Sequence, residues 1–252
     1  MLAWPAARIG SGRNELERSE RMRLAWLFDV DGTLIRSYGT AREAFSEAAR
    51  HVLGVEDPLD DFAFAGGLDP LLLRSVGERH GRTLDPQETA RFWEVVAART
   101  QAGLEAGRAR VLPGIRELLA EIAKEPEWIP GLLTGNGPDM ARLKLGHFGL
   151  LDAFAFAAFG DEAEDRDALA CLAVERVRER WQVPADRCIV VGDTERDVRC
   201  ARAAGARSIA VMTGTRTRDD LVPAGPDLLL EDLADTERIL RWARAIADGA
   251  DD

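Results

Sequence analysis

Three short segments of the sequence carry residue types suited to chemistry on an anionic group. They are residues 29–33 (DVDGT), 134–137 (TGNG) and 192–197 (GDTERD). Carboxylates crowded into one cleft repel one another and need a cation, and Mg²⁺ is the expected ion for hard oxygen ligands. Glycines in such turns expose backbone N–H groups that can hold phosphate oxygens. One carboxylate could attack phosphorus, and another could protonate the leaving group and then activate water.

Each of these segments follows an apolar run that we expect to be a strand. The runs at residues 24–28, 129–133 and 188–191 are compact and apolar, as is typical of buried parallel strands. Further strands are expected at 153–159, 208–211 and 227–230, and helices at 114–124, 138–147, 168–181, 197–204 and 233–246. This alternation predicts a doubly wound α/β fold, with helices on both faces of a parallel sheet. Ligands bind at the carboxyl ends of the strands in such sheets, so the three segments should meet there.

The stretch between the first two segments has a different pattern. Helices are expected at residues 40–53, 68–80 and 86–104, with almost no strand signal between residues 36 and 110. We therefore divide the chain into an N-terminal extension (1–22), an α/β core (23–36 and 110–252) and a helical insertion (37–109). Tyr38 and Gly39 are expected to form the hinge between core and insertion. The extension is either loosely docked on the core or precedes a natural start at Met22.

The composition of the chain excludes several classes of protein. Of its 252 residues, 46% are hydrophobic, which is enough for a full core and too many for global disorder. A net charge of −11 argues against nucleic-acid binding. The apolar stretches are far shorter than the ~20 residues of a membrane-spanning helix. Three cysteines without a CxxC spacing predict neither a disulfide framework nor a zinc site, and they favour the cytoplasm.

Taken together, the motifs resemble those of the haloacid dehalogenase-like (HAD) hydrolase superfamily, in its phosphoglycolate-phosphatase-like branch. The first motif is FDVDGTL at residues 28–34, the second corresponds to LLTGN at 132–136, and the fourth to VVGDTERDV at 190–198. The resemblance extends over residues 24–246. It implies a Rossmann-like core with an inserted α-helical cap. It also implies Mg²⁺-dependent hydrolysis of a small phosphorylated metabolite through an aspartyl-phosphate.

The resemblance further implies a role for each matched residue of the first two motifs. Asp29 would attack phosphorus and bind Mg²⁺ through its other oxygen. Asp31 would be the general acid and base, with its backbone carbonyl on the metal. Thr134 would hydrogen-bond the phosphoryl group, helped by backbone N–H groups around Gly32 and Gly135.

Three more residues complete the expected site. Asn136 of the second motif is placed with the substrate-binding residues. In the fourth motif, Asp193 would bind Mg²⁺ directly, and Asp197 would complete or support the metal shell. The metal ligands expected from the resemblance are thus Asp29, Asp31, Asp193 and Asp197.

The sequence departs from the family pattern at the third motif. Family members usually carry a lysine in the region that corresponds to residues 159–170, and none is present there. Arg166 and Lys144 are the two candidates to replace it. We predict Arg166, because Lys144 lies six residues into a helix that begins near Pro138, and should be ~9 Å from the edge of the sheet.

Two other functions remain open at this point. A phosphomutase on the same fold would keep both acids of the first motif and retain the phosphoryl group for a second transfer. A non-catalytic binding or regulatory protein is favoured only by the missing lysine. The natural substrate depends on the insertion, where Arg42, Asp69 and Arg74 are candidates to face the site. The oligomeric state cannot be predicted.

Overall fold

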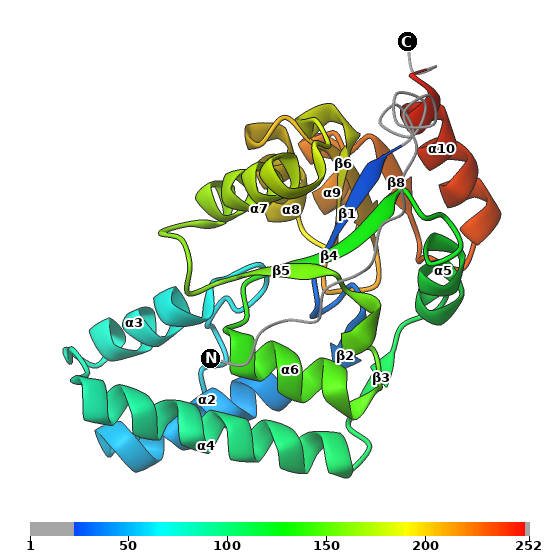
Figure 1. Ribbon diagram of the computed structural model, residues 1–252. Helices are drawn as coiled ribbons and strands as arrows, with labels where there is room; N and C mark the ends of the chain where they lie inside the picture. The colour runs from blue at the N-terminus through cyan, green and yellow to red at the C-terminus, as the bar shows by residue number, and fades with distance from the viewer. Residues whose placement is uncertain (1–22, 250–252) are drawn as a thin grey trace.

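The computed structural model describes residues 23–249, and a six-stranded sheet lies at its centre (Figure 1). The strands lie in the order β5-β4-β1-β6-β7-β8, and every neighbouring pair is parallel. Their bounds are β1 (Leu24–Phe28), β4 (Trp128–Thr134), β5 (Phe156–Phe159), β6 (Cys188–Gly192), β7 (Arg207–Val211) and β8 (Leu228–Leu230). The chain winds outward from β1 in both directions, which confirms the predicted doubly wound α/β fold.

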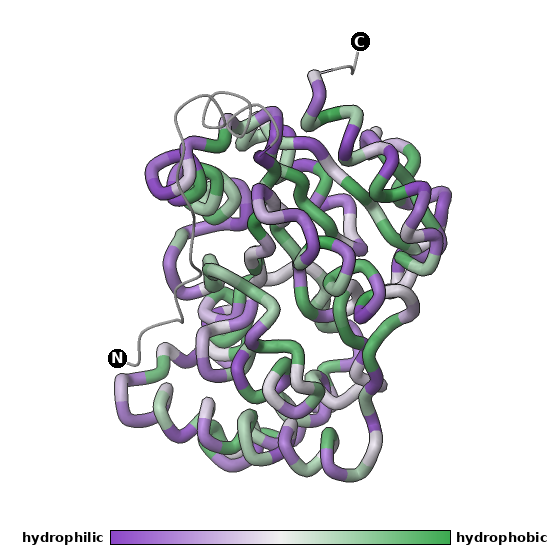
Figure 2. The backbone as a smooth tube through the Cα atoms, turned by 45° about the vertical axis from the view of Figure 1, so that its right-hand side comes forward, coloured by the Kyte–Doolittle hydropathy of each residue, from purple (hydrophilic) through white to green (hydrophobic). Residues whose placement is uncertain are grey.

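Residues of β1 alternate between two apolar cores, one on each face of the sheet. Leu24, Trp26 and Phe28 pack on one face, and Ala25 and Leu27 on the other. The first face is covered by α5 (Ile115–Ile122), α6 (Pro138–His147) and α10 (Thr236–Asp248), and the second by α7 (Arg166–Trp181) and α8 (Glu195–Ala203). Because both faces are covered, the strands are continuous apolar runs. In Figure 2 the helices alternate between hydrophilic and hydrophobic residues along their length.

The helical insertion lies against the carboxyl edge of the sheet (Figure 1). It consists of α2 (Thr40–Leu53), α3 (Asp69–Arg79) and α4 (Pro86–Glu105). Its apolar core centres on Phe45, whose ring lies 5.2 Å from that of Phe64 and 5.4 Å from that of Phe92, both edge-to-face. Met140 of α6 joins this cluster, so the insertion packs on the core through α6.

A two-stranded antiparallel ribbon connects insertion and core. It pairs β2 (Ile35–Ser37) with β3 (Ala109–Val111), so that Ile35 faces Val111 and Ser37 faces Ala109. The prediction of almost no strand between residues 36 and 110 was therefore wrong at both ends of the insertion. Three residues are too few to show a period of two, and the pairing joins segments that are far apart in the sequence.

Most predicted helices and strands begin and end within two or three residues of their predicted bounds, and the differences have local causes. The strand expected from residue 153 begins at Phe156, because residues Leu151–Ala153 form a 3₁₀ turn. Helix α7 begins at Arg166 rather than 168, with the Asp165 side chain accepting from the N–H of Ala168. A one-turn helix, α9 (Arg218–Leu221), was not predicted.

Two further predictions concern the N-terminal extension and the absence of a membrane-spanning helix. The extension 1–22, including Met22, lies outside the described residues. Within residues 23–249, no helix is both long enough and apolar enough to cross a membrane.

Candidate active site

The three polar segments meet at the carboxyl edge of the sheet. Strand β1 lies between β4 and β6, so Asp29, Thr134 and Asp193 stand at the ends of three adjacent strands. The N–H of Asp29 still donates to the carbonyl of Val191 (2.9 Å), which continues the sheet pairing up to the first carboxylate. The predicted convergence is therefore present in the structure.

The turn after Asp29 requires glycine at position 32. Gly32 has a φ of +86°, and a Cβ there would lie 2.5 Å from Oδ2 of Asp193. Gly214 encloses the same carboxylate from another side, where a Cβ would lie 1.6 Å from that oxygen. The N–H of Gly32 donates to the carbonyl of Ile35 (2.8 Å). Gly32 therefore makes room for Asp193, and its own N–H is already used within the turn.

Asp29 and Asp193 are buried carboxylates that lie close to other acids. Burial raises the pKa of Asp29 to about 7; Arg166 opposes this rise, and Asp197 and Asp31 add to it. The pKa of Asp193 is raised well above its usual value by burial and by the charges of Asp197 and Asp29. Both groups would be stabilised as anions by a bound cation.

Asp31 has one engaged carboxylate oxygen and one that is free. Its Oδ2 accepts from Nδ2 of Asn136 (2.8 Å) and from Nζ of Lys144 (2.6 Å). Its Oδ1 is buried and has no hydrogen-bond partner among the residues that the structure describes. An unpartnered buried oxygen is costly when it is charged, so a proton on this atom would relieve that cost.

Arg166 connects two of the acids. Its guanidinium lies 3.1 Å from Oδ1 of Asp29, and it donates to Oδ1 of Asp197 through both Nε (2.9 Å) and Nη2. Only 4% of Arg166 is exposed, so it does not pair with acids on the surface. Because α7 begins at Arg166, its side chain leaves the first turn of the helix and reaches the sheet edge.

Asp197 has hydrogen bonds on both of its oxygens. Arg166 occupies Oδ1, while Oδ2 accepts from the backbone N–H (3.0 Å) and the hydroxyl (2.6 Å) of Thr194. This capping box begins α8. The structure therefore gives Asp197 a supporting position behind Asp29 and Asp193.

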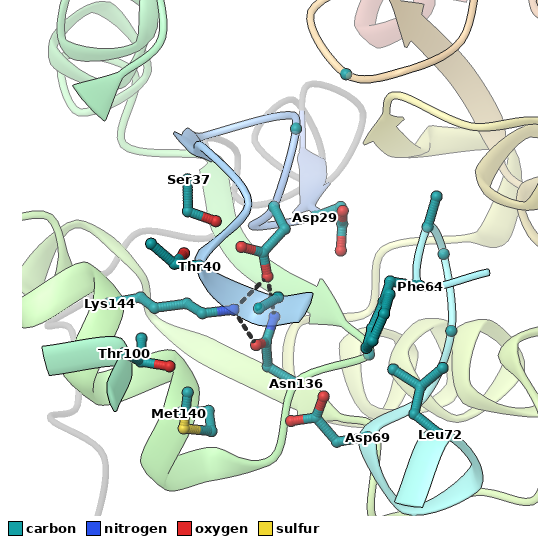
Figure 3. Close-up of a pocket in the computed structure, with 18 of the residues that line it drawn as sticks. Asp29, Ser37, Thr40, Phe64, Asp69, Leu72, Thr100, Asn136, Met140 and Lys144 are labelled. Carbon is teal, nitrogen blue, oxygen red and sulfur yellow. Dashed lines mark hydrogen bonds and ion pairs between the residues drawn. The ribbon is translucent and has the colours of Figure 1, made fainter. Parts of the chain in front are cut away.

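The predicted position of Lys144 was wrong. Its Nζ lies 2.6 Å from Oδ2 of Asp31 and 2.6 Å from Oδ1 of Asn136, and only 6% of the residue is exposed (Figure 3). Side chains of a helix lean toward its N-terminus, so the long lysine side chain recovers the distance lost along α6. Arg166 and Lys144 thus both lie at the site, beside different carboxylates.

The second motif holds the first through Asn136. The Nδ2 of Asn136 donates to Asp31 and to Oγ1 of Thr134 (2.9 Å), while its Oδ1 accepts from Lys144. Thr134 is fully buried and does not line the cavity, whereas Gly135 and Asn136 do. In the structure Thr134 therefore positions Asn136, a role that its place in the motif did not indicate.

The insertion closes the site from the opposite side. The N–H of Asp69 donates to the carbonyl of Gly135 (2.8 Å), and its Oδ2 accepts from the N–H of Gly137 (2.8 Å). Of the three charged residues expected to face the site, only Asp69 lines the cavity; Arg42 pairs with Asp60 and Arg74 is exposed.

The cavity measures ≈ 220 Å³ and is partly open to solvent. Most residues of the insertion that line the cavity could not be picked out from the sequence, because such side chains are also typical of a helical core. Among them are Thr40, Ala41, Phe45, Phe64, Leu72, Trp93, Val96 and Thr100.

The acids at the sheet edge fit a hard divalent cation. Asp29 and Asp193 supply carboxylate oxygens, and because burial raises the pKa of both, a cation beside them would favour their ionised forms. Within residues 23–249, no three His, Cys, Asp or Glu side chains are gathered closely enough to hold a metal ion alone. The remaining ligands would be backbone oxygen, water and substrate, and an ion that keeps several waters suits such a site.

Comparisons with known proteins agree with this geometry. Residues 25–205 match a family model described as haloacid dehalogenase-like hydrolase. A phosphoglycolate phosphatase of Synechococcus elongatus is 34% identical over 212 residues, covering 84% of this chain and 94% of the relative. The CbbY protein of Cereibacter sphaeroides is 29% identical over 219 residues, covering 84% of this chain and 93% of the relative.

Solved structures show the same architecture. A hydrolase from Pseudomonas syringae superposes with a TM-score of 0.68 at 25% identity, covering 87% of this chain and 99% of the other. CbbY from Rhodobacter sphaeroides, in complex with xylulose-(1,5)bisphosphate, gives a TM-score of 0.69 at 26% identity. The match covers 85% of this chain and 96% of the other.

Proposed function

Because the chain belongs to the haloacid dehalogenase-like hydrolase family, we propose that it is a Mg²⁺-dependent phosphatase acting on a small phosphomonoester through an aspartyl-phosphate on Asp29. One observation carries this proposal: Asp29, Asp31 and Asp193 line one cavity at the carboxyl edge of the sheet. The phosphatase names of the relatives support it.

Asp29 acts as the nucleophile in this proposal. Arg166 holds Oδ1, which leaves Oδ2 to attack phosphorus while the bond to the leaving oxygen breaks. The ion would be held by Asp29, Asp193 and the backbone carbonyl of Asp31, and when bound it supplies positive charge to the phosphoryl oxygens. Arg166 favours the ionised form of Asp29 and lies where negative charge develops during transfer.

Asp31 handles the proton in both half-reactions. Lys144 and Asn136 bind its Oδ2 and fix the orientation of the carboxyl group. Asp31 then gives a proton to the leaving alcohol, and later takes a proton from the water that attacks the aspartyl-phosphate. That second step releases phosphate and regenerates Asp29.

The second motif and the insertion form a wall beside these residues. Gly135 lies against the carbonyl of Gly67 so closely that a Cβ would approach within 1.9 Å of that oxygen. Gly135 and Asn136 are the residues of the second motif that line the cavity, and we assign them to the phosphoryl group. Thr134 contributes by holding Asn136 in place.

Release of phosphate from p-nitrophenyl phosphate tests this function. We expect turnover with Mg²⁺ and its loss in EDTA, with Asp31→Asn at least ~100-fold slower than wild type. Asp152→Asn is a matched control, because Asp152 is exposed and does not line the cavity. Absence of Mg²⁺-dependent turnover would favour a non-catalytic binding protein. Transfer of the phosphoryl group to a second sugar phosphate, in place of release, would favour a phosphomutase.

A further inference from the structure

The cavity has two ends with different chemistry. The end at the sheet edge carries the carboxylates Asp29, Asp31 and Asp193. The other end is formed by the insertion and α6, and its walls are aromatic, aliphatic or hydroxyl side chains (Figure 3). These are Thr40, Phe45, Phe64, Leu72, Trp93, Thr100 and Met140. A substrate with its phosphate at the first end must place its leaving group against the second.

The cations that line the cavity are held on its core side. Lys144 spends two of its three donors on Asp31 and Asn136, and its charge is matched by Asp31. Arg166 is matched by Asp29 and Asp197.

Arg36 is the remaining cation of the lining, and it belongs to the ribbon. It donates to the carbonyl of Thr213 on the loop after β7 (2.9 Å), and its guanidinium carbon lies 5.9 Å from the centre of the exposed Tyr38 ring. Among the described residues of the lining, those of α2, α3 and α4 include no cation.

The insertion instead presents a carboxylate to the cavity. Asp69 lies at the start of α3, and the N–H of Gly137 fixes one of its oxygens. Burial raises its pKa to about 6, with Lys144 opposing the rise, so Asp69 is ionised at neutral pH. A second anionic group of the substrate that lies beside Asp69 would therefore meet a negative charge and apolar walls.

On the premise of the proposed phosphatase activity, we infer that the leaving alcohol is uncharged and has an apolar face. Esters that carry a carboxylate or a second phosphate fit this cavity poorly. The ≈ 220 Å³ volume suits an alcohol of a few carbons, since pockets for drug-sized ligands are about 300–1,000 Å³. Ser37, Thr40 and Thr100 offer hydroxyls to polar groups of such an alcohol.

A matched set of phosphate esters tests this inference with the wild-type protein. 2-Phosphoglycolate and 2-hydroxyethyl phosphate have the same carbon chain and differ in the distal charge, while n-butyl phosphate adds apolar surface. We expect kcat/KM for 2-hydroxyethyl phosphate to exceed that for 2-phosphoglycolate at least ~10-fold, and n-butyl phosphate to be better still. An equal or higher value for 2-phosphoglycolate would overturn the inference and leave the phosphatase intact. No turnover of any ester, p-nitrophenyl phosphate included, would instead overturn the proposed function.

The variant Asp69→Asn tests the electrostatic part separately. Asn keeps an acceptor for the N–H of Gly137 but removes the charge, so the kcat/KM ratio of 2-phosphoglycolate to 2-hydroxyethyl phosphate should rise about tenfold. Glu78→Gln is the control, because Glu78 is exposed on the same helix. A ratio in Asp69→Asn that equals the control would contradict the role of Asp69. Phe64→Ala should lower the ratio of n-butyl to 2-hydroxyethyl phosphate, and an unchanged ratio would contradict the apolar contact.

Discussion

Replacing Asp29 with Asn should stabilise the metal-free protein, although it removes the nucleophile. Asp29 is 6% exposed, and its carboxylate shares the sheet edge with three other acids. Burial raises its pKa from 3.8 to about 7 even though Arg166 opposes the rise. Asn has nearly the same shape and carries no charge, so the variant avoids the cost of ionising this group.

The size of the effect follows from the pKa. The pKa of Asp29 rises from 3.8 to about 7. Ionising Asp29 therefore costs about 4 kcal/mol more in the folded protein than in the unfolded chain. We expect a net gain of about 2–4 kcal/mol for the variant at pH 8, where wild-type Asp29 is ionised. For a chain of this length, that gain should raise Tm by about 5 °C or more.

The sign of the pH dependence is fixed by the same shift. The folded protein keeps the Asp29 proton up to a higher pH than the unfolded chain does. The stability of the wild type therefore falls as the pH rises from about 4 to about 7, and the variant lacks this contribution. The advantage of the variant should shrink by more than half between pH 8 and pH 5.

Urea unfolding in EDTA at pH 5 and pH 8 measures this difference, with Asp152→Asn as the control. Mg²⁺ should then stabilise the wild type more than the variant, because ligands that bind only the folded state raise its stability. A variant that is no more stable than wild type at pH 8 would refute the reasoning. So would an advantage that does not change with pH.

Three further predictions concern the groups around the nucleophile. Arg166→Met leaves buried carboxylates unpaired, so kcat/KM should fall at least ~100-fold and the free energy of unfolding by about 3 kcal/mol; full activity would contradict this. Lys144→Met should lower kcat about 10-fold or more and shift the pH profile of kcat, because Lys144 binds the general acid Asp31. An unshifted profile would mean that Lys144 has only a structural role. Gly32→Ala places a Cβ 2.5 Å from Oδ2 of Asp193 at a φ of +86°, so titration calorimetry should show weakened Mg²⁺ binding; wild-type affinity would count against the site.

The parallel sheet could be predicted because each of its strands is a local apolar run. Residues 24–28 were predicted and observed as β1, and helices at 40–53 and 138–147 begin and end where expected. Pairing between distant segments leaves no such local pattern. The β2–β3 ribbon was missed for this reason, although it connects the insertion to the core.

The candidate site was predictable where a residue stands at a strand end. Asp29 and Asp193 lie at the sheet edge because β1 and β6 are adjacent. The position of Lys144 depends on where its long side chain points, and counting residues along α6 could not supply that direction. The walls contributed by the insertion were unpredictable for a related reason, since packing decides which aromatic side chains of a helical core face the cavity.

Trapping of the covalent intermediate tests the central claim most directly. The protein would be mixed with Mg²⁺ and ³²P-labelled p-nitrophenyl phosphate and quenched in acid. It would then be digested, and the labelled peptide would be identified by mass spectrometry. We predict label on the peptide that carries Asp29, sensitive to hydroxylamine as an acyl-phosphate is, and none in Asp29→Asn. Mg²⁺-dependent phosphate release without label on Asp29, or equal label in Asp29→Asn, would contradict the assignment of Asp29 as the nucleophile.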